Sequence, residues 1–218
     1  MALEILEKYG IDCDDLCSGL FSDVMDKMGY KNQIIVNMKN NQKMVNFIGR
    51  ARTIDIATKD TENENIRKGL SFIGQLGIED ILFVKGSNKF AYFGELMTKL
   101  STRQGIQGVI IDGLTRDTNY TFRDEVKLPV LAKGYSPVDI KGRGCVETVD
   151  TIITVDGIRV EPGDLIYADN EAVCVIPKII ENEVMQKVKE KLNDENRITQ
   201  LIESGMSVEV LLENVTEF

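Results

Sequence analysis

The stretch Gly108-Val-Ile-Ile-Asp-Gly-Leu-Thr-Arg-Asp117 decides the fold class of this chain. It begins as a continuous apolar run, which is typical of a strand buried on both faces of a sheet. A second run of this kind occupies Asp80–Val84. Each of the two runs is preceded by a segment with helical character, Asn63–Leu76 and Glu95–Arg103. Buried strands that alternate with helices predict an α/β layer.

The second half of the chain has a different pattern, with short strands separated by turns. Asp156-Gly157 stands between two β-branched segments and indicates a hairpin, and Pro162-Gly163-Asp164 indicates a second turn. From Lys178 to about Ser204 apolar residues recur at a helical period. This long C-terminal helix has much polar surface, so we expect its apolar stripe to need a partner subunit. Since no linker or repeat interrupts the sequence, we expect one domain over residues 1–218.

The charge and the residue inventory exclude several classes of function. The 218 residues include 26 basic and 35 acidic side chains, a net charge of −9, and no histidine. An acidic chain repels phosphate backbones and anionic lipid, so we expect no binding of nucleic acid or membranes. The absence of histidine excludes Ser-His-Asp and Cys-His catalysis and histidine-ligated zinc. Any chemistry must therefore use carboxylates, Arg, Lys, Tyr, Cys, backbone amides or a metal held by oxygen.

Cysteine spacing and the N-terminal sequence indicate a cellular compartment. Cys13 and Cys17 are close in sequence, but Cys145 and Cys174 are isolated, and this is no zinc-binding pattern. The first residues carry charges where a signal peptide has its apolar core. No apolar run approaches the ~20 residues of a membrane span. We therefore expect a cytoplasmic protein with reduced thiols.

A glycine at a predicted strand-to-helix junction gives the first candidate binding site. Gly94 follows the strand-like Ala91-Tyr-Phe93, and the amides of Glu95, Leu96 and Met97 are the first of the next helix. Such amides have no intrahelical acceptor and suit a carboxylate or phosphate, and glycine permits close approach. An ordinary turn, with Glu95 as an acid that favours the helix dipole, is the alternative.

The end of the decisive stretch gives the second candidate site. The strand delivers Asp112, Arg116 and Asp117 to its carboxyl end, where open α/β sheets bind ligands. The carboxylate of Asp117 suits Mg²⁺ or Mn²⁺, and Arg116 offers a fixed cation for a developing oxyanion. The alternative is that Arg116 and Asp117 form a capping or ion pair at the start of a helix over about 118–123.

Together these segments resemble the RraA-like family, which includes class II pyruvate aldolases acting on 4-hydroxy-4-methyl-2-oxoglutarate. The matching segments, in the family's order, are Ser22–Asp26, Ala91–Leu96, Arg103–Asp117, Leu128–Val130, Val160–Asp169 and Val175–Pro177. In the aldolases an acid, twenty intervening residues and an Arg-Asp pair follow one another, and Glu95 and Arg116-Asp117 have this spacing. The family acid is usually Asp, so Glu95 is a departure.

The resemblance implies a swivelling β/β/α domain with a long C-terminal helix, assembled as a homotrimer or a hexamer with sites between subunits. It implies that Asp117 and water hold Mg²⁺ or Mn²⁺. A Glu from a neighbouring subunit's C-terminal helix completes the site, and Glu195, or else Glu190, is the match. The substrate-binding residues that the resemblance implies are Gly94, Glu95, Leu96, Met97 and Arg116.

The activity that the resemblance implies is a metal-dependent lyase reaction on a small 2-oxo acid. The enzyme would release pyruvate from 4-hydroxy-4-methyl-2-oxoglutarate and decarboxylate oxaloacetate, since both reactions pass through the pyruvate enolate. Arg116, Glu95 and Glu195 are the candidate catalytic residues, and water steered by Glu95 or Glu195 could move protons without histidine. The alternative is a non-catalytic regulator that binds a ribonuclease or another protein. The ribonuclease-inhibitor branch tends to lose the acidic pair, so Glu95 and Asp117 favour the enzyme.

Two further candidates have simpler interpretations. Tyr92 and Phe93 could line a pocket, but we expect them to pack in the core of a strand. Lys85 follows a buried strand, as a Schiff-base lysine could, but the nearby Lys89 indicates a solvated loop.

Overall fold

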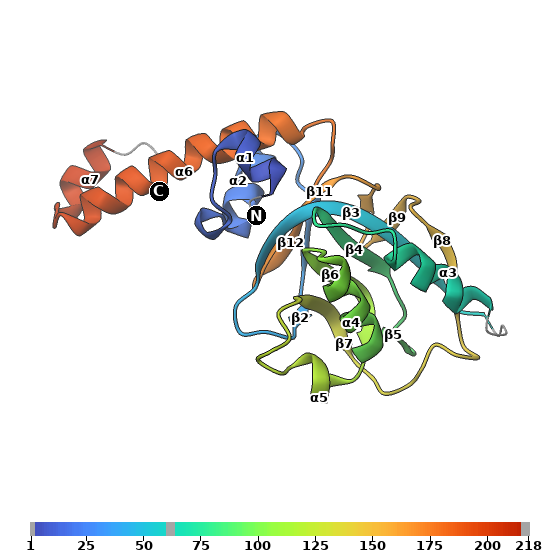
Figure 1. The fold of residues 1–218 in the computed structure, drawn as a ribbon. Helices are drawn as coiled ribbons and strands as arrows, with labels where there is room; N and C mark the ends of the chain where they lie inside the picture. The colour runs from blue at the N-terminus through green and yellow to red at the C-terminus, as the bar shows by residue number, and fades with distance from the viewer. Residues whose placement is uncertain (1–2, 60–63, 215–218) are drawn as a thin grey trace.

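The computed structural model describes residues 3–59 and 64–214 and contains one large mixed sheet with helices packed against it (Figure 1). The strands of this sheet run in the order β1-β12-β11-β3-β4-β6-β7-β2, with β5 paired to β6 and β8 paired to β3. Its strands are β1 (Ile34–Val36), β2 (Lys39–Asn40), β3 (Asn46–Ala57), β4 (Asp80–Lys85), β5 (Ala91–Phe93), β6 (Gly108–Thr115), β7 (Val130–Tyr135), β8 (Cys145–Val149), β11 (Leu165–Asp169) and β12 (Ala172–Ile176). A separate hairpin joins β9 (Ile153–Val155) to β10 (Ile158–Val160).

The helices are distributed over the whole described chain. They are α1 (Glu4–Tyr9), the short 3₁₀ helix η1 (Cys13–Asp15), α2 (Ser18–Lys27), α3 (Glu64–Ile73), α4 (Glu95–Gln104), α5 (Thr118–Thr121), α6 (Glu181–Glu203) and α7 (Val208–Asn214). The expected start of a helix at Asn63 lies outside the described residues. Among the residues that are described, no helix combines the length and the apolar character that crossing a membrane requires.

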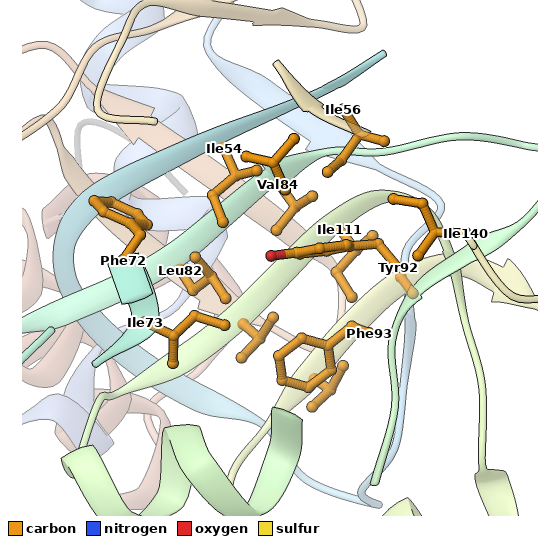
Figure 2. Close-up of a cluster of buried hydrophobic side chains, with 14 of the residues drawn as sticks. Ile54, Ile56, Phe72, Ile73, Leu82, Val84, Tyr92, Phe93, Ile111 and Ile140 are labelled. Atoms are coloured by element: carbon orange, nitrogen blue, oxygen red, sulfur yellow. The ribbon is translucent and has the colours of Figure 1, made fainter. Parts of the chain in front are cut away.

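Alternating side chains of the central strands fill two cores on opposite faces of the sheet. Leu82 and Val84 of β4 join the core beneath α3 and α4, together with Tyr92 and Phe93, which are buried as expected (Figure 2). Their neighbours Ile81 and Phe83 belong to the core that includes the β9–β10 hairpin. This alternation is the two-residue period of a strand, and it explains why the run at residues 80–84 is apolar throughout.

A third core joins the N-terminal helices to the start of α6. The ring of Phe21 stacks on Tyr167 at 4.7 Å, and the Tyr167 hydroxyl donates a hydrogen bond to the carbonyl of Leu16. Arg50 of β3 forms two hydrogen bonds with the carboxylate of Glu181, which fixes the first turn of α6. Beyond Val188 most of α6 is exposed, and Figure 1 shows it running away from the sheet toward α7.

The decisive strand is longer than its sequence predicts. The sequence predicts Asp112 at the carboxyl end of this strand, whereas β6 continues to Thr115 and its register against β7 shifts between Ile111 and Leu114. Gly113 makes this continuation possible, because a Cβ there would lie 2.5 Å from the amide nitrogen of Ser87. Asp112 therefore lies within the strand and is wrongly placed at its carboxyl end by the sequence analysis.

Candidate active site

A pocket of about 440 Å³ lies where β5 and β6 lead into α4 and α5. Two hydrogen bonds to one carbonyl hold these strand ends together: the amide of Arg116 and the side-chain hydroxyl of Thr115 both donate to the carbonyl of Phe93. The residues that line the pocket are Glu95, Arg116, Asp117, Thr118, Asn119, Tyr120, Arg123, Tyr135, Ser136 and Pro137. The structure thus brings Glu95, Arg116 and Asp117 to one pocket, although twenty residues separate Glu95 from the Arg-Asp pair.

Gly94 allows the two chain segments to approach closely. It is the N-cap of α4 and has an extended backbone that any residue can adopt. A Cβ at this position would lie 2.4 Å from Oδ2 of Asp117 and 2.9 Å from Cγ of Arg116. The need for glycine here is therefore one of space.

Asp117 connects the start of α4 to the start of α5. It adopts a left-handed backbone with φ of 61°, which Asp tolerates better than most residues. Its carbonyl accepts hydrogen bonds from the amides of Tyr120 and Thr121, but its side chain makes no capping bond to α5. The carboxylate instead accepts a hydrogen bond of 2.9 Å from the amide of Glu95. The expectation that Asp117 caps α5 with its side chain is therefore wrong, because the carboxylate binds the first amide of α4 instead.

Arg116 lies between two carboxylates. Its Nη1 donates a 2.7 Å hydrogen bond to Oδ2 of Asp139, and its Nε is 3.7 Å from Oδ2 of Asp117. Partial burial would raise the pKa of Asp139, but the amide of Lys141 and the guanidinium of Arg116 outweigh this effect and lower the pKa. Arg116 and Asp117 are therefore an ion pair, as one alternative predicts, but the shorter contact of Arg116 is to Asp139.

Glu95 forms an ion pair along α4. Its carboxylate accepts a 2.5 Å hydrogen bond from Nζ of Lys99, and this bond raises the pKa of Lys99. The next two residues of α4 lie differently from Glu95. Leu96 is 79% exposed and Met97 packs against the core, and neither they nor Gly94 line the pocket.

The two C-terminal candidates lie away from the pocket of their own chain. Glu195 is 3.5 Å from Nζ of Lys191, which also donates a 2.7 Å hydrogen bond to Asp23 of α2. Figure 1 shows α6 on the side of the N-terminal helices α1 and α2, away from α4 and α5. Glu190 is exposed on the same helix. Either residue could serve a site only in another copy of the chain.

Sequence reasoning missed Asp139, Tyr120, Arg123 and Tyr135. Tyr135 ends β7, and Asp139 follows in the next loop, where it bridges to Ala91. Because β6 and β7 are parallel, their carboxyl ends meet at the same edge of the sheet. A prediction of β7 as a parallel neighbour of β6 would have indicated residues 135–139.

The acidic groups of the pocket fit a hard divalent cation that keeps most of its ligands as water and substrate. Asp117 offers a carboxylate with 41% of its side chain exposed, and Glu95 lines the same pocket. Mg²⁺ is usually bound through one or two carboxylates together with water and substrate oxygens. Over residues 3–59 and 64–214, no cluster of three or more Asp, Glu, Cys or His residues is arranged to hold a metal by itself.

Comparison with known proteins gives consistent results over most of the chain. The family model RraA-like (Aldolase/RraA) matches residues 17–175. A Halalkalibacterium halodurans protein named "Putative 4-hydroxy-4-methyl-2-oxoglutarate aldolase" is 28% identical over 195 residues, which are 89% of each chain.

Two solved structures are similar in fold. An uncharacterised protein from Pseudomonas syringae pv. tomato has a TM-score of 0.83 at 23% identity, over 99% of this chain and 95% of that one. RraAS2 of Streptomyces coelicolor, described as an unusual member of the RNase ES inhibitor RraA family, has a TM-score of 0.76 at 18% identity, over 90% and 96%. These similarities confirm the expected fold.

Proposed function

This chain belongs to the RraA-like (Aldolase/RraA) family, and from this premise we propose that it is a divalent-metal-dependent lyase. Its reaction would be cleavage of a C–C bond in a 2-oxo acid, with 4-hydroxy-4-methyl-2-oxoglutarate and oxaloacetate as substrates that both yield pyruvate. The observation that carries the proposal is the meeting of Glu95, Arg116 and Asp117 at one pocket. A protein that only binds another protein has no evident need for this arrangement.

Asp117 is the residue that would hold Mg²⁺ or Mn²⁺. A bound cation supplies a Lewis acid that stabilises negative charge on the oxygens of the 2-oxo acid. Arg116 is held in place by Asp139 and adds a fixed positive charge for the oxyanion that develops at the bond being broken. Leu96 and Met97 are not among the residues that line the pocket, but their amides belong to the same first turn of α4 as Glu95, which does. They would receive the substrate's carboxylate, because the amide of Glu95 is bonded to Asp117.

Carboxylates would handle the proton transfers. Glu95 lies on the pocket wall and can accept the proton of the substrate's 4-hydroxyl group. The neighbouring subunit's C-terminal helix would supply Glu195 as the second carboxylate, in a homotrimer or a hexamer. Glu195 lies beside Lys191, which bonds to Asp23 of α2 and not to any residue of the pocket, and this supports a role for Glu195 in the site of another copy.

The test is pyruvate release from 4-hydroxy-4-methyl-2-oxoglutarate and from oxaloacetate, with Mg²⁺ or Mn²⁺ and with EDTA. We expect metal-dependent activity that falls on the order of 100-fold in Asp117→Asn, since this change removes the anionic ligand and keeps the shape. Asp26→Asn, an exposed position on α2, is the matched control and should keep full activity. Activity that EDTA and Asp117→Asn leave unchanged, or no activity with any divalent metal, would favour the non-catalytic regulator instead.

A further inference from the structure

The candidate active site continues beyond Asp117 to a second cationic group. The same pocket is lined by Tyr120 at the end of α5 and by Arg123 just after it. Arg123 Nε donates a 3.0 Å hydrogen bond to the carbonyl of Asn119, and its guanidinium carbon lies 5.6 Å from the centre of the Tyr120 ring. A backbone bond and an aromatic face therefore set the direction of this side chain.

Three cationic side chains at or near this part of the pocket, Lys99, Arg116 and Arg123, are paired to different degrees. Lys99, which also approaches the Tyr120 ring, donates a 2.5 Å hydrogen bond to the carboxylate of Glu95. Arg116 donates a 2.7 Å hydrogen bond to the carboxylate of Asp139. Nη1 of Arg123 lies 3.9 Å from Oε1 of Glu125, which is too long for a hydrogen bond. Arg123 thus has guanidinium donors available to a ligand, with 56% of its side chain exposed.

An oriented guanidinium of this kind recognises a carboxylate through two parallel hydrogen bonds. This inference rests on the proposed function, in which the 2-oxo acid group at one end of the substrate lies at Asp117. We propose that Arg123, supported by Tyr120, binds a second carboxylate at the opposite end of the substrate. This subsite would select dicarboxylic 2-oxo acids over monocarboxylic ones of the same length.

The two reactions use this carboxylate differently. In the aldol cleavage the distal carboxylate keeps its charge throughout, so Arg123 binds the ground state and the transition state equally and lowers KM without changing kcat. In oxaloacetate decarboxylation the distal carboxylate itself departs as CO₂ and its electron pair enters the enolate. Arg123 then stabilises the ground state, so its removal should raise KM without lowering kcat.

A binding experiment tests the subsite without any turnover. The probes are 2-oxoglutarate and 2-oxopentanoate, which have the same length and differ in the distal carboxylate, measured by calorimetry with Mg²⁺ present. We expect the wild-type protein to bind 2-oxoglutarate about 10- to 100-fold more tightly. Arg123→Gln should remove this preference without weakening 2-oxopentanoate, and Arg123→Lys should restore part of it. Arg103→Gln, an exposed arginine on the last turn of α4, should leave the preference intact.

Kinetics with the cleavable pair provide the second readout. Arg123→Gln should lower kcat/KM for 4-hydroxy-4-methyl-2-oxoglutarate about 10- to 100-fold through KM, and leave 4-hydroxy-2-oxopentanoate unchanged. Equal binding of the two probes by the wild-type protein, or equal weakening of both in Arg123→Gln, would overturn the subsite. A retained preference for 2-oxoglutarate with no pyruvate released from any substrate would overturn the proposed lyase and leave the subsite standing.

Discussion

Asp139 and Asp117 both lie within reach of the guanidinium of Arg116, and the two N–O distances show that Arg116 interacts more strongly with Asp139. The contact to Asp139 is a charge-assisted hydrogen bond of 2.7 Å, whereas the contact to Asp117 is a longer ion pair at 3.7 Å. Asp139 thus keeps Arg116 from closing on Asp117. The carboxylate of Asp117 stays available to a cation as a result.

Replacing Asp139 by Asn should therefore impair activity without removing a group that touches the substrate. We expect Arg116 to move toward Asp117 and kcat/KM to fall about 10-fold, with a higher Mg²⁺ concentration needed for half-maximal rate. A titration of pyruvate release against Mg²⁺ measures both effects. Unchanged metal dependence would contradict this role for Asp139, and Asp26→Asn is again the control.

The ion pair between Arg116 and Asp139 predicts a small pH dependence of the free energy of unfolding. The folded-state pKa of Asp139 is lowered, so its contribution is present above the pKa of the unfolded chain and is lost as pH falls through the folded value. The contribution should be about 0.5 kcal/mol, because the side chain is 40% exposed. Urea unfolding of wild type and Asp139→Asn should differ by this amount at pH 7 and converge at acid pH.

At the scale of elements, the spacing between the start of α4 and the end of β6 depends on Gly94. The change Gly94→Ala places a Cβ against Asp117 and Arg116, although the backbone of Gly94 suits alanine. We expect a loss of about 1–3 kcal/mol in unfolding free energy and at least about a 10-fold loss of activity. Gly77→Ala is the control, since a Cβ there meets nothing within 4 Å. A fully active Gly94→Ala protein would show that this close approach is dispensable.

Apolar runs were sufficient to predict the central strands, because β4 and β6 are buried on both faces and local composition reports that burial. The helix after Gly94 was predicted for a similar reason, since glycines bound it at both ends. The continuation of β6 past Ile111 was missed, because it depends on Gly113 passing over Ser87, a contact between distant parts of the chain.

The candidate site was predicted in part, and the limits have physical causes. The resemblance to the aldolases, in which an acid precedes an Arg-Asp pair at this spacing, predicted that Glu95 meets Arg116 and Asp117. The bond from the Glu95 amide to Asp117 could not be predicted, because an Asp before a helix normally caps that helix. Asp139 and Arg123 carry no local pattern, since parallel strand order and an aromatic ring place them at the pocket.

At the scale of the whole molecule, the sheet holds the pocket, and the second half of α6 extends from the sheet as an arm that carries Glu195. Only the first turns of α6 are buried, while Ile202 on the arm and Val208 and Leu212 on α7 are largely exposed. An arm with apolar side chains suits contact with another copy of the chain.

Complementation between two inactive variants tests this arrangement. Asp117→Ala removes the proposed metal ligand and Glu195→Gln removes the proposed carboxylate of the neighbour. If the site joins two chains, co-expressing the two variants in equal amounts should restore about a quarter of wild-type activity, because one site in four combines both intact residues. Each variant alone should be inactive, and mixtures that remain inactive would contradict a shared site. Glu183→Gln, an exposed acid on the first turn of α6, is the matched control.

The bond between the Glu95 amide and Asp117 has a consequence for what the pocket admits. The carboxylate of Asp117 already accepts a hydrogen bond at the positive end of α4, so a simple anion such as chloride or phosphate is repelled by a negative charge at this position. A ligand that combines a divalent cation with an organic acid can neutralise the aspartate with its cation, while its carboxylate bonds to the remaining amides of the helix start. We therefore expect the pocket to prefer the metal complex of an organic acid over a simple anion such as chloride.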